Sequence, residues 1–192
     1  MNKVLLLASG MSASEVHDYD YKANGWTIVA INNGWQVTED WDIWVRPGDF
    51  DGKRPEVIKD TQEVCAKYSE SLNHFGGHKA CGYSITLCAS YYSLWKYKPD
   101  VMGFLGCDMN YTPDADGNTH IYGIGSDIKK RGIPDPDRMV QQYAKGNENY
   151  LNDIYMRLVS EAERWSNCKV YNLSSVIDTR LPYNKAKPFD FQ

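Results

Sequence analysis

The sequence predicts an α/β fold with a single doubly wound, mostly parallel, Rossmann-like sheet and helices on both of its faces. Three apolar runs of strand length carry this prediction: residues 4–8, 26–31 and 101–106. Strands that are apolar on both faces are typical of a parallel sheet buried between two layers. Helical patterns alternate with these runs, as they do in sheets covered by helices. The length matches one domain, so we expect residues 1–192 to form a single α/β unit.

The first predicted strand is followed by a turn of small residues. Ser9 and Gly10 come directly after the run of residues 4–8, and Ser12 and Glu15 have the spacing of a capping box, which predicts a short helix. A strand, a small-residue turn and a helix form the first half of a nucleotide-binding βαβ unit, in which free backbone N–H groups at the helix start can bind a phosphate. A tight turn that binds nothing is the alternative interpretation.

The next two predicted strands also end in polar residues. The run of residues 26–31 leads into Asn32 and Asn33, whose amides lie where a ribose or a base binds in a doubly wound fold. The same Asn-Asn-Gly sequence is also an ordinary turn signal. Residues 42–45 form a short third strand that leads into Arg46 and a Pro-Gly loop.

The second half of the chain alternates helix and strand in the same way. The expected elements are helices over residues 55–68, 84–97 and 138–165 and strands over residues 101–106 and 168–171. Residues 107–134 are rich in Gly, Asp, Asn and Pro and have no clear periodicity. A loop of this length in a compact domain is usually functional or disordered, and we interpret it as functional.

Two further polar residues lie near strand ends in this arrangement. Ser84 precedes a buried helix behind the sheet, and Asp108 follows the strand of residues 101–106. Ligands of open α/β sheets bind beyond the carboxyl ends of the strands. We therefore expect both residues to line one pocket with the serine, glycine and asparagine residues named above. Trp35 lies just past the two asparagines. Its side chain either packs in the core or stacks on a base or sugar of the ligand.

Composition and charge exclude several classes of protein. The chain has 21 Lys and Arg residues against 25 Asp and Glu, a net charge of −4, and no run of basic residues, which disfavours a tightly held nucleic acid. Its five cysteines include no pair at C-x-x-C spacing, which favours free thiols and a cytoplasmic location. The apolar run near the N-terminus is too short for a signal sequence or a membrane span, so no transmembrane segment is expected.

The predicted functional loop contains the strongest candidates for catalysis. His120 lies in a Thr-His-Ile-Tyr-Gly sequence, and imidazole is the side chain suited to proton transfer near neutral pH. Tyr122 lies two residues on, so an extended segment would direct both side chains to the same side. An exposed loop histidine without a catalytic part is the alternative. Residues 114–118 resemble a calcium loop only superficially, because the glycine and glutamate positions of an EF-hand are missing, so we expect no metal site.

Several short motifs resemble the bacterial sialyltransferases of glycosyltransferase family 42. Ala8-Ser-Gly-Met-Ser-Ala-Ser-Glu-Val16 is similar to the G-x-G-P-S-L-x-E-I opening of that family, and Asn32 ends the second strand as an asparagine does there. Arg46-Pro-Gly48 stands where the family has Asn-Pro-Gly. Gly82-Tyr-Ser84, the following helix and Phe104-Leu-Gly-Cys-Asp108 resemble the Thr-Ser-Gly, helix, strand and Gly-x-Asp order of the family. The resemblance extends over about residues 1–165.

The resemblance implies a metal-independent glycosyltransferase that uses a nucleotide-activated sugar and no further cofactor. The nucleotide-sugar-binding residues would be Ser9, Gly10, Ser12, Asn32, Asn33, Arg46, Ser84 and Asp108. His120 would be the general base that deprotonates an acceptor hydroxyl, and Tyr122 would assist the departing phosphate. The sequence departs from the family at Ala8 and Met11, which replace the first glycine and the proline. Residues 145–149, where the family has its catalytic histidine, contain none.

Two functions of other classes remain open at this point. One alternative to the glycosyltransferase is a nucleotide-binding module without transferase activity, which the altered opening motif favours. The other is an enzyme similar to phosphotransferases and pyrophosphokinases, although this sequence has no P-loop. The acceptor of a transferase is equally open among a glycan, a lipid and a modified nucleobase. A homo-oligomer is possible.

Overall fold

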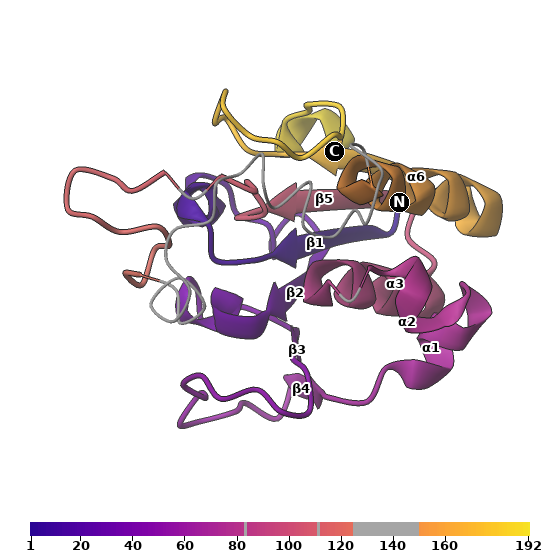
Figure 1. The fold of residues 1–192 in the computed structure, drawn as a ribbon, viewed down its shortest axis with the longest axis horizontal. Helices are drawn as coiled ribbons and strands as arrows, with labels where there is room; N and C mark the ends of the chain where they lie inside the picture. Colours follow the sequence, from indigo (N-terminus) through magenta and orange to yellow (C-terminus); the bar gives the residue numbers. More distant parts are fainter. Residues whose placement is uncertain (83, 111, 125–149) are drawn as a thin grey trace.

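The computed structural model describes residues 1–82, 84–110, 112–124 and 150–192. Its sheet has six parallel strands in the order β4-β3-β2-β1-β5-β6 (Figure 1). The strands are β1 (Lys3–Leu7), β2 (Trp26–Ile31), β3 (Ile43–Val45), β4 (Glu63–Cys65), β5 (Val101–Leu105) and β6 (Lys169–Asn172). The helices are η1 (Met11–Asp18), η2 (Asn32–Gln36), α1 (Ser69–His74), α2 (Gly77–Ala80), α3 (Ile85–Tyr97), α6 (Tyr150–Ser166) and η3 (Pro188–Phe191). The predicted α/β fold with a parallel, Rossmann-like sheet is confirmed.

The three most apolar strands form the centre of the sheet, as the sequence predicts. β1 pairs with β2 on one side and with β5 on the other, and every residue of β1 and β5 is buried. Alternate side chains of β1 enter two separate cores. Val4 and Leu6 pack with α3 and α6, whereas Leu5 and Leu7 pack with residues of η1 and with Phe191 of η3. Both faces are therefore covered, one by α-helices and the other by short 3₁₀ helices and loops.

The chain winds in two directions from the centre. It runs from β1 through β2 and β3 to β4 at one edge, and then crosses to β5 and β6 on the other side of β1. The two directions separate between β1 and β5, which makes the carboxyl ends of these strands the topological switch point. In Figure 1 the segment that follows β5 extends well beyond the carboxyl ends of the strands.

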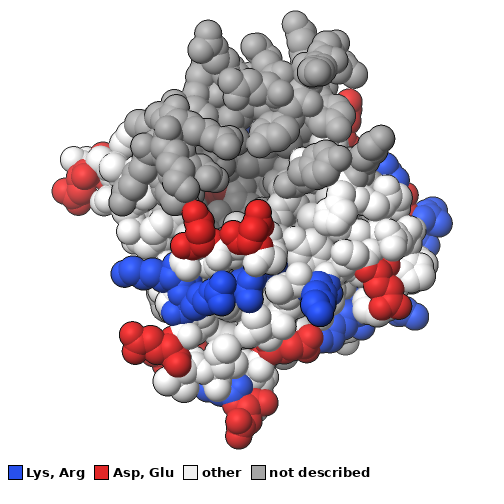
Figure 2. All heavy atoms as spheres, turned by 60° about the horizontal axis from the view of Figure 1, so that its bottom comes forward, with Lys and Arg blue, Asp and Glu red and all other residues white. Residues whose placement is uncertain are grey.

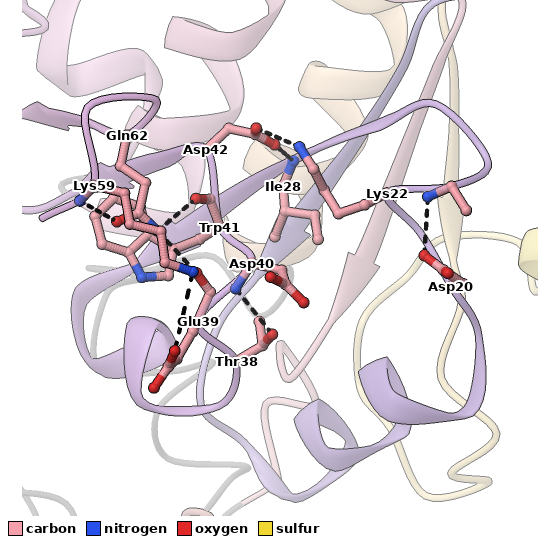
Figure 3. A network of polar contacts seen from close by, with 11 residues as sticks. Asp20, Lys22, Ile28, Thr38, Glu39, Asp40, Trp41, Asp42, Lys59 and Gln62 are labelled. Carbon is pink, nitrogen blue, oxygen red and sulfur yellow. Dashed lines mark hydrogen bonds and ion pairs between the residues drawn. The ribbon is translucent and has the colours of Figure 1, made fainter.

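The helix predicted over residues 55–68 is wrong, because this stretch contains the edge strand β4. The Gln62 side chain donates to the carbonyl oxygens of Glu39 (2.8 Å) and Trp41 (2.9 Å), and the Glu63 backbone N–H donates to the carbonyl oxygen of Asp42 (2.8 Å). The contacts of Gln62, drawn in Figure 3, and that of Glu63 hold the chain alongside β3. Val57 and Ile58, two apolar residues of this stretch, are 78% and 45% exposed.

The capping box predicted for the first helix is also wrong. Gly10 occupies the N-cap of η1 and gives no side-chain cap. The Ser12 hydroxyl binds Asp108, and the Glu15 carboxylate accepts hydrogen bonds from the backbone and side chain of Ser175. Partners distant in sequence therefore hold both side chains that would have formed the box.

The remaining predicted elements agree with the structure where it describes them. α3 ends before Pro99, and its residues from Leu87 to Leu94 are buried. The strands predicted over residues 101–106 and 168–171 are β5 and β6. α6 represents the C-terminal part of the helix predicted over residues 138–165, and the N-terminal part to residue 149 lies outside the described residues. Within the described ranges, no helix combines the length and apolar character of a membrane-spanning segment.

η2 crosses the end of β1 with almost no space between the two backbones. A Cβ atom built on Gly34 would lie 2.2 Å from the carbonyl oxygen of Leu7. We expect Gly34→Ala to lower the free energy of unfolding by about 2 kcal/mol, because one of the two backbones must move. Urea unfolding measures this loss. Gly48→Ala is the matched control, because its Cβ would meet nothing within 4 Å, and equal stability of the two variants would contradict the close approach.

One partly exposed ion pair at the edge strand makes the free energy of unfolding weakly dependent on pH. Glu63 of β4 binds Lys96 and accepts a hydrogen bond from the Tyr92 hydroxyl, both of α3. The Lys96 hydrogen bond, with a smaller effect of Tyr92, lowers the pKa of Glu63 below its ordinary value of 4.5. A lowered carboxyl pKa contributes stability above the unfolded-state value, and this contribution is lost as the pH falls through the folded-state pKa.

We therefore expect Glu63→Gln to cost less than about 1 kcal/mol of unfolding free energy at neutral pH, since half of the carboxylate side chain is exposed. The difference from the parent protein should vanish when the pH lies below the lowered pKa. Urea unfolding across this range tests the expectation, with the exposed Glu70→Gln in α1 as control. A cost that persists in acid would show that the contact does not depend on charge.

Candidate functional site

The carboxyl edge of the sheet brings together most of the residues predicted to bind a ligand. Arg46 follows β3, Asn32 follows β2, Ser9 follows β1 and Asp108 follows β5. These strands are consecutive in the sheet, and neighbouring strands lie about 4.8 Å apart. Residues separated by up to 99 positions, about half of the chain, therefore form one row along this edge.

Within this row the switch point is closed by hydrogen bonds between its own residues. The Asp108 carboxylate accepts from the backbone N–H of Ser12 (2.9 Å) and from the Ser12 hydroxyl (2.5 Å). The same hydroxyl accepts from the backbone N–H of Gly106 (2.9 Å), and the Gly10 N–H donates to the carbonyl oxygen of Gly106 (2.8 Å). The carboxylate thus lies at the start of η1, where a phosphate was expected. Ser12, Gly10 and Asp108 do lie together, but Ser12 and Asp108 bind each other and Gly10 binds the backbone of Gly106.

A C-terminal segment that the sequence did not single out completes the switch point. The carbonyl oxygen of Asp108 accepts from the backbone N–H of Arg180 (2.9 Å) and from the Thr179 hydroxyl (3.2 Å). The Lys185 ammonium group donates to the carbonyl oxygens of Ser174 (2.6 Å) and Val176 (2.8 Å), and burial lowers the pKa of this lysine. In the sequence, the only indication that this segment contributes to the site is a stretch of Ser, Asp and Thr residues after the last strand.

The loop that carries His120 and Tyr122 returns to the end of β1. The backbone N–H of Ile121 donates to the carbonyl oxygen of Ser9 at 3.2 Å, and Ile121 packs on the core beneath η1. A tight turn joins His120 and Gly123, whose backbones exchange hydrogen bonds of 2.9 and 3.0 Å. The two aromatic rings stack with centroids 5.3 Å apart and an interplanar angle of 29°. The predicted catalytic pair is therefore adjacent to the predicted binding turn.

The His120 ring is held by the residue before it. Its Nδ1 lies 3.0 Å from the Thr119 hydroxyl, which is a hydrogen bond whose direction depends on the imidazole tautomer. Thr119 is 1% exposed, so its hydroxyl has little freedom to leave this contact. The Asp114 carboxylate accepts from the backbone N–H groups of Asp116 (2.9 Å) and Asn118 (2.8 Å), as expected for a turn.

The ends of β2 and β3 present a cation and unpaired polar atoms. The Arg46 guanidinium lies 5.3 Å from the centre of the Trp44 ring and donates to the adjacent Pro47 carbonyl oxygen at 3.1 Å. Among the described residues, Nε of Arg46 and Oδ1 of Asn32 are buried without a hydrogen-bond partner. Asn32 has a φ of +49°, and its carbonyl oxygen accepts from the Trp44 indole (2.6 Å). These two atoms have no hydrogen-bond partner in the described structure, unlike the polar groups at the switch point.

Ser84 and Asn33 differ in how they relate to this row. Ser84 occupies the N-cap of α3, on the face of the sheet opposite to η1, and makes no side-chain cap. Asn33 lies in η2 beside Asn32, and its side-chain oxygen accepts from Gln36 (3.1 Å). The structure therefore places Asn33 in the row of candidate residues, whereas Ser84 begins the helix behind it.

A groove of about 1060 Å³ lies next to the row. Its walls are residues 35–41, which form the end of η2 and the segment after it, and residues 53–62, which precede β4. Trp35 spans the groove at one end, where its indole donates to the carbonyl oxygen of Lys53 (3.2 Å). Gln62 closes the other end through Glu39 and Trp41 (Figure 3). Sequence reasoning missed this groove because it interpreted the second wall as a helix.

The chain was compared with protein-family models, curated proteins and solved structures. No family model, curated protein or solved structure matches the chain. The described residues also contain no group of three or more His, Cys, Asp or Glu side chains that could hold a metal ion. The geometry and chemistry of the site itself must therefore indicate the function.

Proposed function

We propose that the chain is a glycosyltransferase that moves a sugar from a nucleotide-activated donor to an acceptor hydroxyl without a metal ion. The hydrogen bond from Ile121 to Ser9 carries this proposal. It holds an imidazole and a phenol beside the carboxyl end of β1, which is where ligands of doubly wound sheets bind. The combination of a proton acceptor with a donor-binding edge is what a glycosyl transfer needs.

The donor phosphate is assigned to the Arg46 side of the edge. The Asp108 carboxylate already occupies the start of η1, and its negative charge disfavours a phosphate there. Arg46 has no carboxylate partner among the described residues, and its guanidinium can bind phosphate oxygens with two parallel hydrogen bonds. The Asn32 and Asn33 side chains then lie within reach of the ribose or base.

The proposed reaction uses each group at a defined atom. The acceptor oxygen attacks the anomeric carbon of the donor sugar, and the bond from that carbon to the phosphate oxygen breaks. The acceptor proton passes to the His120 imidazole. Tyr122 donates a hydrogen bond to the phosphate oxygen as its negative charge develops, and Arg46 offsets the charge that a metal ion offsets in other transferases.

A thermal-shift screen of nucleoside diphosphate sugars and nucleoside monophosphate sugars tests donor binding, because a ligand of the native state raises the Tm. We expect at least one donor to raise the Tm equally with and without EDTA. Arg46→Gln should weaken that donor by about tenfold or more, since it loses charge-assisted hydrogen bonds. Lys98→Gln, at the opposite edge of the sheet, should leave it unchanged. No shift with any donor, or a shift that needs magnesium, would contradict the proposal.

The closed switch point favours one alternative, a nucleotide-binding module without transfer. The Asp108 carboxylate occupies the helix start at which many nucleotide enzymes bind a phosphate. A protein that binds a nucleotide elsewhere and transfers nothing could tolerate this loss. The two functions differ in turnover. A module would bind the donor and release no free nucleotide in the presence of any acceptor, whereas the transferase would release one nucleotide for each sugar transferred.

A further inference from the structure

The groove between residues 35–41 and 53–62, which His17 also lines, is large enough for an extended ligand. Its two walls are bonded to each other at both ends, through Trp35 and Gln62, while the space between them stays open. The volume of about 1060 Å³ is at the upper limit of ordinary small-molecule pockets. The groove therefore has room for several linked units.

The charges that line the groove cancel. Its charged residues, apart from His17, are three acids and three bases: Glu39, Asp40, Glu56, Lys53, Arg54 and Lys59. Within the described part of the chain, the only ion pair among these six joins Lys59 and Glu39 at 4.0 Å. Figure 2, which brings the β4 side of the molecule forward, shows a band of basic side chains with acidic side chains on both sides of it. A balanced lining gives no net attraction to a polyanion such as a nucleic acid or to an anionic lipid head group.

The same side chains suit a neutral ligand that is rich in hydroxyl groups. Carboxylates accept hydrogen bonds from hydroxyls, and ammonium and guanidinium groups donate to them. The partly exposed Trp35 adds an aromatic surface for the apolar C–H face of a sugar ring, and its position is fixed by Trp44, whose ring is 6.4 Å away. These are the two kinds of contact that a carbohydrate chain requires.

One end of the groove is connected to the end of β1 through η2. Trp35 is the neighbour of Gly34, which packs directly on the carbonyl oxygen of Leu7. Leu7 ends β1, and Ser9, two residues later, accepts the hydrogen bond from Ile121. A glycan that fills the groove and continues past Trp35 would extend toward the end of β1, where Ile121 holds the loop that carries His120.

We propose that this groove holds the acceptor and that the acceptor is a neutral glycan chain. This inference rests on the proposed glycosyltransferase function and decides among the glycan, lipid and nucleobase acceptors that the sequence leaves open. Lys53, Arg54, Asp40 and Glu56 bind hydroxyl groups of the chain, and Trp35 stacks on the ring nearest to the reaction centre.

The test is titration calorimetry of the full chain with neutral hexasaccharides of glucose, galactose, mannose and N-acetylglucosamine, with a heparin hexasaccharide and a deoxythymidine decamer as anionic probes. At least one neutral hexasaccharide should bind at millimolar concentration or below, and the anionic probes should bind more weakly. Trp35→Ala should weaken binding by about tenfold. Phe189→Ala, an exposed aromatic in η3 far from the groove, should not change it.

Three results would overturn the inference: no binding of any neutral hexasaccharide, stronger binding of an anionic probe, or unchanged affinity in Trp35→Ala. Gln36→Ala, which shortens a polar side chain of the same wall, provides a second variant if Trp35→Ala does not fold. The donor screen separates the two proposals. Donor binding without glycan binding contradicts only the acceptor inference, whereas glycan binding without donor binding contradicts the transferase and leaves a carbohydrate-binding groove.

Discussion

Replacing His120 by alanine is expected to lower kcat by about 100-fold or more while donor affinity changes little. The imidazole removes a proton from the acceptor in the proposed reaction, and general base catalysis commonly contributes this much to a rate. Donor affinity is preserved because the donor is assigned to Arg46 and the asparagines rather than to the histidine. Steady-state kinetics with the donor and acceptor from the two binding screens gives kcat, and the thermal shift gives donor affinity.

Two companion variants separate catalysis from local structure. Tyr122→Phe keeps the ring that stacks on His120 but loses the phenolic hydroxyl, so its kcat should fall by less than that of His120→Ala. His74→Ala removes an exposed histidine of α1 on the other face of the sheet and should leave turnover unchanged. If His120→Ala retained near full turnover with the true substrates, the general base would have to be sought elsewhere along the edge.

The central part of the fold could be predicted because its signal is local. β1, β2 and β5 are apolar at almost every position, and this pattern has no stable place except a buried parallel strand. α3 was predictable for a similar reason, since small and apolar residues on nearly every face require a buried helix. The central place of these three strands in a parallel sheet was predictable on the same ground, whereas the full strand order comes from the structure.

Predictions failed where the deciding contact joins distant segments. Residues 63–65 contain no strong strand signal and become a strand because β3 offers an unpaired edge beside them. Ser12 has the spacing of a cap, but a carboxylate 96 residues away competes for its hydroxyl. The row of candidate site residues was predictable from strand ends, whereas the use of Ser12 and Asp108 to close the switch point depends on side-chain geometry that no spacing reveals.

Asp108→Ala is expected to lower the free energy of unfolding by about 4 kcal/mol. The carboxylate is 5% exposed and accepts two hydrogen bonds from Ser12, and each hydrogen bond to a charged group contributes about 1.5–3 kcal/mol. Without it, the backbone N–H and hydroxyl of Ser12 are buried with fewer acceptors. Urea unfolding followed by circular dichroism measures the loss, and Asp178→Ala, which removes an exposed carboxylate from the nearby C-terminal segment, should change stability by less than about 0.5 kcal/mol.

A double-mutant cycle tests whether Ser12 and Asp108 act as one unit. Ser12→Ala should also destabilise the protein, because it removes the hydroxyl that bridges Asp108 and the backbone N–H of Gly106. The double variant should be more stable than the sum of the two losses predicts, by about 1–2 kcal/mol, since each single change already breaks the shared contact. Strict additivity, or an Asp108→Ala variant as stable as Asp178→Ala, would show that the switch point is not closed by this pair. The start of η1 would then be free for a phosphate, and the donor would have to be reassigned from Arg46 to Ser9, Gly10 and Ser12.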